Sequence, residues 1–132
     1  MTGLAPWARR AVLLLVSALL LIDAVSVFFL LANPEAWVAG RKVEGAEALR
    51  VYLPLWGAAL VLEAAALRLA SRARCFFASV LLLPAAGLHF QSWMLAGGPA
   101  GLWEAVAASA ASLLGLLCGG AEAPLPEHHG QG

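Results

Sequence analysis

Apolar residues in this chain form four helix-length runs that are separated by short polar joints. The clearest run extends from Val12 to Leu31 and contains a single charged residue, Asp23. A helical stretch of about 20 apolar residues matches the hydrocarbon thickness of a bilayer. The pattern therefore predicts an all-α integral membrane bundle of four transmembrane helices. The predicted spans are at about residues 11–32, 51–70, 75–95 and 102–118.

The joints between these runs indicate how the spans follow one another. Asn33-Pro34 ends the first run, because a residue that precedes proline is disfavoured in a helix. The joint at residues 33–49 is the longest, and we expect residues 43–49 to form a short helical approach along the interface. The second and third joints are short, which favours an up-down-up-down topology. Residues 119–132 are rich in Gly, Pro and His, and we expect a disordered tail there.

Composition supports the membrane interpretation. Hydrophobic residues make up 62% of the 132 residues and charged residues 12%, whereas soluble domains carry about 25% charged residues. The zero net charge leaves no basic footprint for nucleic acid. Arg9-Arg10 followed by an apolar run also fits a signal peptide. That run continues to Ala32, which is too long for the core of a signal peptide, so we expect it to be retained as a span.

Basic residues predict the orientation. If the N-terminus is cytoplasmic, five Lys or Arg residues of the predicted bundle lie on the cytoplasmic side and three on the other, so the positive-inside rule predicts that both termini are cytoplasmic. The five are Arg9, Arg10, Arg68, Arg72 and Arg74, and the three are Arg41, Lys42 and Arg50. Four aromatic residues fall at one level on the opposite side, as in an interfacial belt: Trp37, Tyr52, Trp93 and Trp103.

Four ionisable residues within the predicted spans are the candidate site: Asp23, Glu63, His89 and Glu104. Such groups are costly in hydrocarbon and usually face the interior of a bundle. With a rise of about 1.5 Å per residue, Asp23, His89 and Glu104 lie about 18–21 Å from the cytoplasmic ends of their spans. Glu63 lies only about 10 Å from that end, near Arg68 and the basic turn. We therefore expect the first three residues to share one layer, with Glu63 below it.

A carboxylate beside an imidazole can relay protons, bind a cation or hold the polar end of a lipid-like ligand, because each group favours the charged form of the other. The simpler interpretation is that these polar groups only hold helices together. Both interpretations stay open from the sequence.

The sequence also predicts roles for two further groups of residues, a stripe of small residues and the two cysteines. Ala107, Ala111 and Gly115 form a stripe of small residues on the fourth run, a pattern that lets membrane helices pack closely within a bundle or in a homodimer. Cys75 and Cys118 fall at the cytoplasmic ends of their spans. They are candidates for lipidation, and the alternative is a small buried apolar role.

No phosphate-binding loop, metal-ligand spacing or paired nucleophile is present in the sequence, so we expect no enzyme activity, no metal and no cofactor. The leading hypothesis is a non-enzymatic accessory, assembly or interaction subunit of a membrane complex. Its partners would be the lipid bilayer and other membrane subunits or itself. The alternative is a small carrier or lipid-like ligand-binding bundle that uses Asp23, His89 and Glu104.

Overall fold

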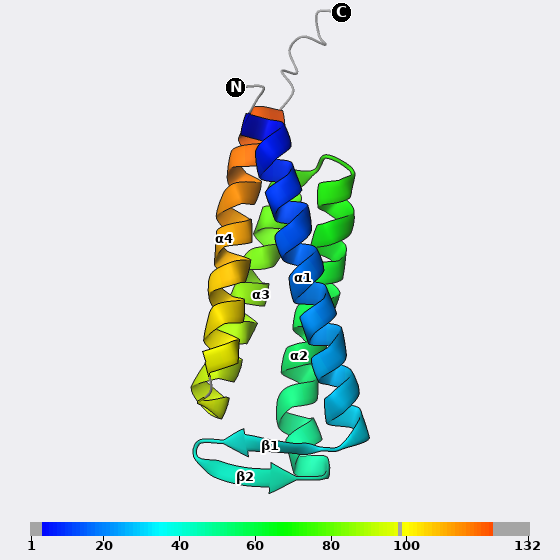
Figure 1. The fold of residues 1–132 in the computed structure, drawn as a ribbon, viewed down its shortest axis with the longest axis vertical. Helices are drawn as coiled ribbons and strands as arrows, with labels where there is room; N and C mark the ends of the chain where they lie inside the picture. Colours follow the sequence, from blue (N-terminus) through cyan, green and yellow to red (C-terminus); the bar gives the residue numbers. More distant parts are fainter. Residues whose placement is uncertain (1–3, 98, 123–132) are drawn as a thin grey trace, which may run out of the picture.

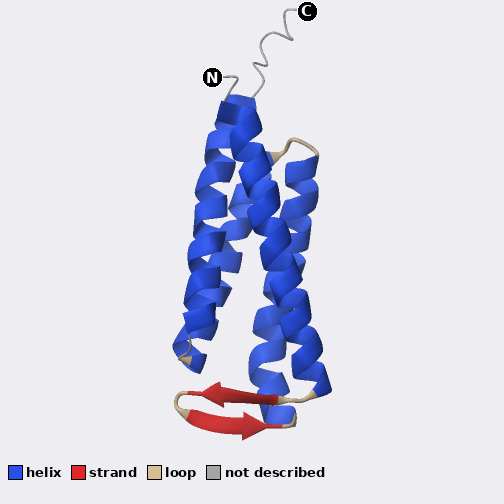
Figure 2. Cartoon of the chain, in the orientation of Figure 1, coloured by secondary structure: helices blue, strands red, loops and turns tan. Residues whose placement is uncertain are grey.

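The computed structural model describes residues 4–97 and 99–122, which form four long helices and a short β-hairpin (Figures 1 and 2). The helices are α1 (Leu4–Ala32), α2 (Ala46–Ser71), α3 (Cys75–Ala96) and α4 (Pro99–Glu122). The predicted all-α class with four packed helices is confirmed, and each helix is long and apolar enough to cross a membrane. The first turn of α1 and the last turn of α4 lie at the same end of the bundle (Figure 1).

The helices extend beyond the apolar runs that predicted them. Helix α1 begins at Leu4 and α2 at Ala46, and α4 continues to Glu122, so residues 119–122 are helical rather than part of a tail. Hydropathy marks only the lipid-facing part of a helix, whereas Arg, Glu and Ala are good helix formers that extend it into the polar flanks. The rest of the predicted tail, residues 123–132, lies outside the described residues.

The joint between α1 and α2 forms a hairpin, so the predicted helical approach over residues 43–49 is wrong for residues 43–45, whereas residues 46–49 are helical as the first turn of α2. Strands β1 (Glu35–Val38) and β2 (Arg41–Glu44) pair antiparallel, with Ala36 opposite Val43. Ala39 and Gly40 connect them with φ angles of 53° and 81°. Two consecutive positive φ angles are typical of the tight turns that suit the twist of a hairpin.

The hairpin is fixed to the ends of three helices. Val43 is buried in a cluster with Leu30 of α1 and Tyr52 of α2. The Tyr52 hydroxyl donates a hydrogen bond to the Trp37 carbonyl, and the Ala39 amide donates one to the Leu95 carbonyl at the end of α3. The hairpin therefore closes one end of the bundle (Figure 2).

Small side chains fill the core at the opposite end. The buried cluster there includes Ala66, Ala70, Ala78 and Ala111 beside the longer Val12. Small residues allow membrane helices to approach closely. Large apolar side chains point outward instead, as expected of a bundle surrounded by lipid. Examples are Leu14, Leu21, Phe28, Phe77, Leu83, Phe90, Met94, Trp103 and Leu113.

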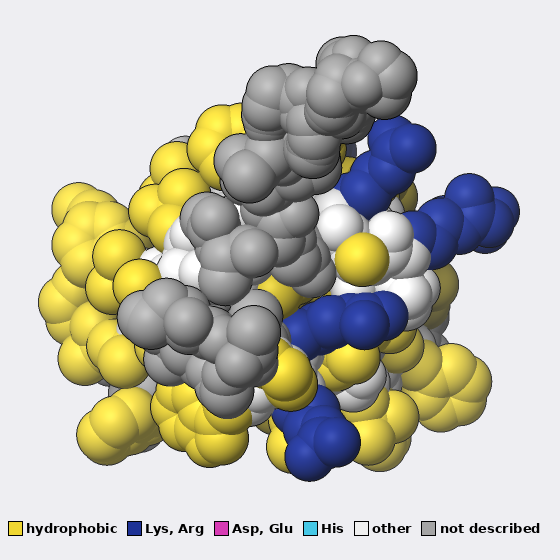
Figure 3. Space-filling model, turned by 90° about the horizontal axis from the view of Figure 1, so that it is seen from above, with side chains coloured by type: hydrophobic (Ala, Val, Ile, Leu, Met, Phe, Trp, Pro, Cys, Tyr) yellow, Lys and Arg dark blue, Asp and Glu magenta, His cyan; other side chains and the backbone are white. Residues whose placement is uncertain are grey.

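Arginines gather at this small-residue end. Figure 3 looks onto it and shows several Lys and Arg side chains on one half of this end face. Arg9 of α1 donates hydrogen bonds to the carbonyls of Ala70 and Ser71 at 3.1 and 2.8 Å. These carbonyls belong to the last turn of α2, where backbone acceptors lack helical partners and a cation is favoured.

Candidate functional site

The four ionisable residues of the spans meet in one cluster around the imidazole of His89. Its Nε2 atom lies 2.7 Å from Glu63 Oε2 and 3.1 Å from Asp23 Oδ2, and its Nδ1 atom lies 3.2 Å from Glu104 Oε1. Each helix supplies one member of this cluster, which we call the His89 cluster: Asp23 from α1, Glu63 from α2, His89 from α3 and Glu104 from α4.

The position of Glu63 differs from the predicted one, because it lies in the His89 layer rather than near the basic turn. Helices α2 and α3 are joined by a short turn at residues 72–74 and run in opposite directions. Side chains lean toward the N-terminus of their own helix. Glu63 therefore leans away from this turn and His89 leans toward it, which brings together two groups whose backbones differ in depth.

Burial makes unpaired charge in the His89 cluster costly in free energy. Asp23, Glu63 and His89 are each at most 1% exposed, and the Glu104 side chain is 17% exposed. Three ionised carboxylates carry three negative charges, of which a protonated imidazole offsets only one. Burying unpaired charge costs several kcal/mol per ion. The remaining negative charge must therefore be balanced by protons held in the cluster or by a bound cation.

Hydrogen bonding within the cluster is incomplete. His89 Nε2 is hydrogen-bonded to Glu63 Oε2. Three other buried atoms have no hydrogen-bond partner among the described residues: Asp23 Oδ2, Glu63 Oε1 and His89 Nδ1. Buried polar atoms in native proteins are nearly always satisfied, so each exception calls for an explanation. A cluster that only held helices together would leave fewer buried polar atoms without a hydrogen-bond partner. The side chains of the His89 cluster instead resemble a set of ligands around a common point.

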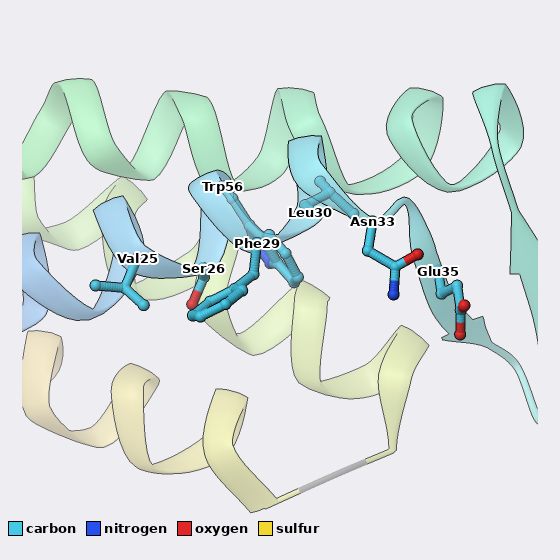
Figure 4. Close-up of a pocket in the computed structure, with 7 residues that line it drawn as sticks. All are labelled: Val25, Ser26, Phe29, Leu30, Asn33, Glu35 and Trp56. Carbon is cyan, nitrogen blue, oxygen red and sulfur yellow. The ribbon is translucent and has the colours of Figure 1, made fainter.

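A pocket of about 470 Å³ lies between the His89 cluster and the hairpin end, and none of the four cluster residues lines it. Figure 4 shows Asn33 and Glu35 at one end of the pocket and Ser26 toward the other. Ser26 follows Asp23 by one helical turn, and Trp56 precedes Glu63 by two turns. Trp56 Nε1 donates a hydrogen bond of 2.9 Å to Ser92 Oγ, one turn beyond His89. The pocket therefore approaches the cluster from the hairpin end, with Trp56 in between.

Glu35 keeps a negative charge near this pocket. Its Oε1 atom lies 2.9 Å from Lys42 Nζ across the hairpin. The hydrogen bond with Lys42 lowers the pKa of Glu35, and the same bond raises the pKa of Lys42. Both side chains are exposed, so the pair adds little stability. Its relevance is electrostatic, because an ionised carboxylate lines the pocket that approaches the cluster.

The opposite side of the cluster is closed by the small-residue core. Ser79 and Ser112 join α3 to α4 there, each donating its hydroxyl to the backbone carbonyl of the other at 2.6 and 3.0 Å. Beyond them lie Ala78 and Cys75 in the buried apolar cluster. The small-residue core thus packs closely on this side of the His89 cluster, away from the pocket at the hairpin side.

The predicted packing stripe lies inside the bundle. Ala111 and Gly115 are buried, and Ala107 packs against a second core cluster. A Cβ atom added to Gly115 would lie 2.9 Å from Ser79 Cβ on α3. The stripe thus packs inside the bundle, and Gly115 lies at the contact between α3 and α4.

The two lipidation candidates lie side by side, which the sequence did not indicate. Cys75 and Cys118 are both buried, and their Sγ atoms are 2.6 Å apart. Neither sulfur is at the surface of this structure, where a lipid would have to be attached. The pairing links the first turn of α3 to the end of α4, far from the His89 cluster in sequence and on the small-residue side of the bundle.

Comparison with known proteins adds no family or relative: no family model, no curated protein and no solved structure matches this chain significantly.

Proposed function

We propose that this chain is a multi-pass membrane protein with up-down-up-down topology, and that it binds a small cationic ligand at the His89 cluster, as a carrier or a ligand-binding bundle. One observation carries the proposal: three carboxylates from three helices converge on one buried imidazole. Ionisable groups at such depth usually mark ion or substrate paths. A cation supplies the positive charge that the protein's own side chains do not.

The pocket on the hairpin side gives such a ligand a route to the cluster. Its polar residues, Asn33, Glu35 and Ser26, lie along the way. The closed apolar core on the other side fits a carrier in a state open to one face only, and it equally fits a binding protein that never opens the second face.

The second candidate is the accessory subunit. The small-residue stripe that suggested it is occupied by α3, but another surface favours a partner. An apolar groove of about 590 Å³ runs between α3 and α4 and is lined by Ala86, Gly87, Ala105 and Ala110 among others. Small residues of this kind accommodate a neighbouring helix.

The two candidates predict different results for purified protein in mild detergent. We expect at least one cation from a panel of Na⁺, Ca²⁺, Mn²⁺, Zn²⁺, choline and spermidine to raise the thermal midpoint, because a ligand at about 100 times its Kd adds about 2.7 kcal/mol. The Asp23→Asn/Glu63→Gln double variant should lose this shift.

An exposed carboxylate provides the matched control for this experiment. Glu47 lies in the first turn of α2 and pairs with Arg41 at the surface. The Glu47→Gln variant should keep the full shift. If no cation stabilises the protein, and native mass spectrometry instead shows a second polypeptide at a fixed ratio, the accessory function replaces the cation-binding one.

A further inference from the structure

We infer that Asp23, Glu63 and His89 form the binding site for a single first-row divalent transition-metal ion, such as Zn²⁺ or Mn²⁺. The inference rests on the proposed function, because it names the cation. It also reverses the expectation that the chain binds no metal. These three residues are separated by long stretches of sequence, so their assembly into one site is visible only in the folded bundle.

Distances in the cluster suit a metal centre. One ligand atom from each of the three residues can be chosen so that all lie within 4.8 Å of one another. Ligand atoms bonded to Zn²⁺ at about 2.0–2.2 Å in a tetrahedron are separated by about 3.3–3.6 Å. The observed separations from His89 Nε2 are 2.7 Å to Glu63 and 3.1 Å to Asp23. Both separations are shorter than the tetrahedral range by less than about 1 Å, so small side-chain movements would bring the two carboxylates to the ligand distances of Zn²⁺ around His89 Nε2.

The unpartnered atoms provide independent support. Asp23 Oδ2 and Glu63 Oε1 are buried acceptors without a donor. His89 Nε2 lies 2.7 Å from Glu63 Oε2 and 3.1 Å from Asp23 Oδ2, so both buried carboxylates converge on this nitrogen, where a positive centre would be shared by all three groups. A metal ion satisfies all three together, whereas the single ring N–H at Nε2 satisfies only one.

Glu104 completes the arrangement from the other side of the ring. Its Oε1 atom lies 3.2 Å from His89 Nδ1. A metal-bound histidine usually presents its second ring N–H to a carboxylate, which fixes the tautomer and directs the other nitrogen at the metal. Glu104 is thus a positioning residue. The tautomer with a proton on Nδ1 satisfies that atom and frees Nε2 for the metal.

The ligand types select the class of ion. Two carboxylates and an imidazole balance the charge of a divalent cation when the imidazole is neutral. Imidazole favours Zn²⁺, Fe²⁺ and related ions over Mg²⁺ and Ca²⁺, and the carboxylates also suit Mn²⁺. Copper(I) prefers sulfur ligands, and the two cysteines lie in the separate small-residue core.

The test uses full-length protein that has been stripped with a chelator, loaded with ZnCl₂ or MnCl₂ and desalted before its metal content is measured. We expect one ion per chain. Asp23→Asn and His89→Gln should each abolish stoichiometric loading, and Glu104→Gln should weaken affinity about 10–100-fold. Glu47→Gln should bind like the unchanged protein.

Two histidines in the tail, His128 and His129, are an alternative source of bound zinc. The His128→Ala/His129→Ala double variant should retain one ion, and X-ray absorption of its zinc-loaded form should show only N and O ligands at about 2.0–2.2 Å. This measurement keeps all the proposed ligands in place and does not depend on whether a ligand variant folds.

Three outcomes would overturn the inference: loading that survives in His89→Gln, loading that is lost in the tail variant, or a zinc–sulfur distance of about 2.3 Å in the absorption spectrum. Stabilisation by choline or spermidine without any metal binding would also overturn it but would leave the proposed function standing. If no cation of either kind binds, both proposals fail.

Discussion

At the scale of single residues, His89 is the one basic group among two buried acids, Asp23 and Glu63, and the partly buried Glu104. This imbalance predicts opposite effects on stability for two substitutions. In the presence of a chelator, Asp23→Asn should raise the free energy of unfolding by about 1–2 kcal/mol, because it removes one uncompensated charge. His89→Leu should lower it by about 3–5 kcal/mol, because it leaves three carboxylates without a partner. Thermal unfolding in detergent measures both changes.

The same two variants distinguish a binding site from a cluster that only holds the helices together. If these polar groups only hold helices together, His89→Leu should destabilise the bundle and Asp23→Asn should leave its stability unchanged or lower it, because asparagine keeps an oxygen that accepts a hydrogen bond from His89. A gain in stability at Asp23 would instead show that the native carboxylate is retained at a cost. Proteins commonly accept such a cost at functional sites.

The depth of each residue along its predicted span locates only part of the His89 cluster. Asp23, His89 and Glu104 fall at similar depths in their spans, and in the structure the His89 ring contacts both Asp23 and Glu104. Glu63 could not be placed in this way, because the direction in which side chains lean changes their depth by several Å. Which face each helix turns inward also depends on tertiary packing.

At the scale of elements, the contact between α3 and α4 depends on Gly115. An added Cβ would lie 2.9 Å from Ser79 Cβ and 3.2 Å from the Cys75 carbonyl oxygen. Gly115→Ala should therefore lower the free energy of unfolding by about 1–3 kcal/mol, as overpacking does. Gly87→Ala on α3 is the matched control, since an added Cβ there meets nothing within 4 Å.

The control should be neutral or gain up to about 1 kcal/mol, because alanine favours a helix over glycine. Unfolding midpoints of the two variants in the same detergent give the comparison. Equal midpoints would show that α3 and α4 can separate slightly without loss, and the close approach at Gly115 would then carry no weight in the fold.

The elements differ in how visible they are in the sequence. Hydropathy alone finds the four helices, because each must present a long apolar surface. The hairpin is hidden for two reasons: its strands are only four residues long, and its turn places Ala39 at a positive φ of 53°, which alanine disfavours. The alternation around Trp37 and Val43, with Gly40 between them, was the available signal.

At the scale of the whole molecule, the two ends of the bundle differ in charge. Arg9, Arg10, Arg68, Arg72 and Arg74 belong to the end viewed in Figure 3, and the acidic residue at this end of α4 is Glu122. At the hairpin end, Arg41, Lys42 and Arg50 are accompanied by Glu35, Glu44 and Glu47. The positive-inside rule counts basic residues alone and predicts that the arginine-rich end is cytoplasmic. The pocket, which lies toward the hairpin end, would then be nearer to the opposite face of the membrane.

Thiol labelling in intact cells tests this orientation. Ser71, at the end of α2, and Glu44, in β2, are exposed at opposite ends of the bundle. We expect a membrane-impermeant maleimide to label Glu44→Cys in intact cells and Ser71→Cys only after permeabilisation. The unchanged chain is the control for background, because Cys75 and Cys118 are buried. The reverse pattern would turn the bundle over, so that the ligand would reach the His89 cluster from the cytoplasm. Labelling of both variants in intact cells would contradict the four-span topology itself.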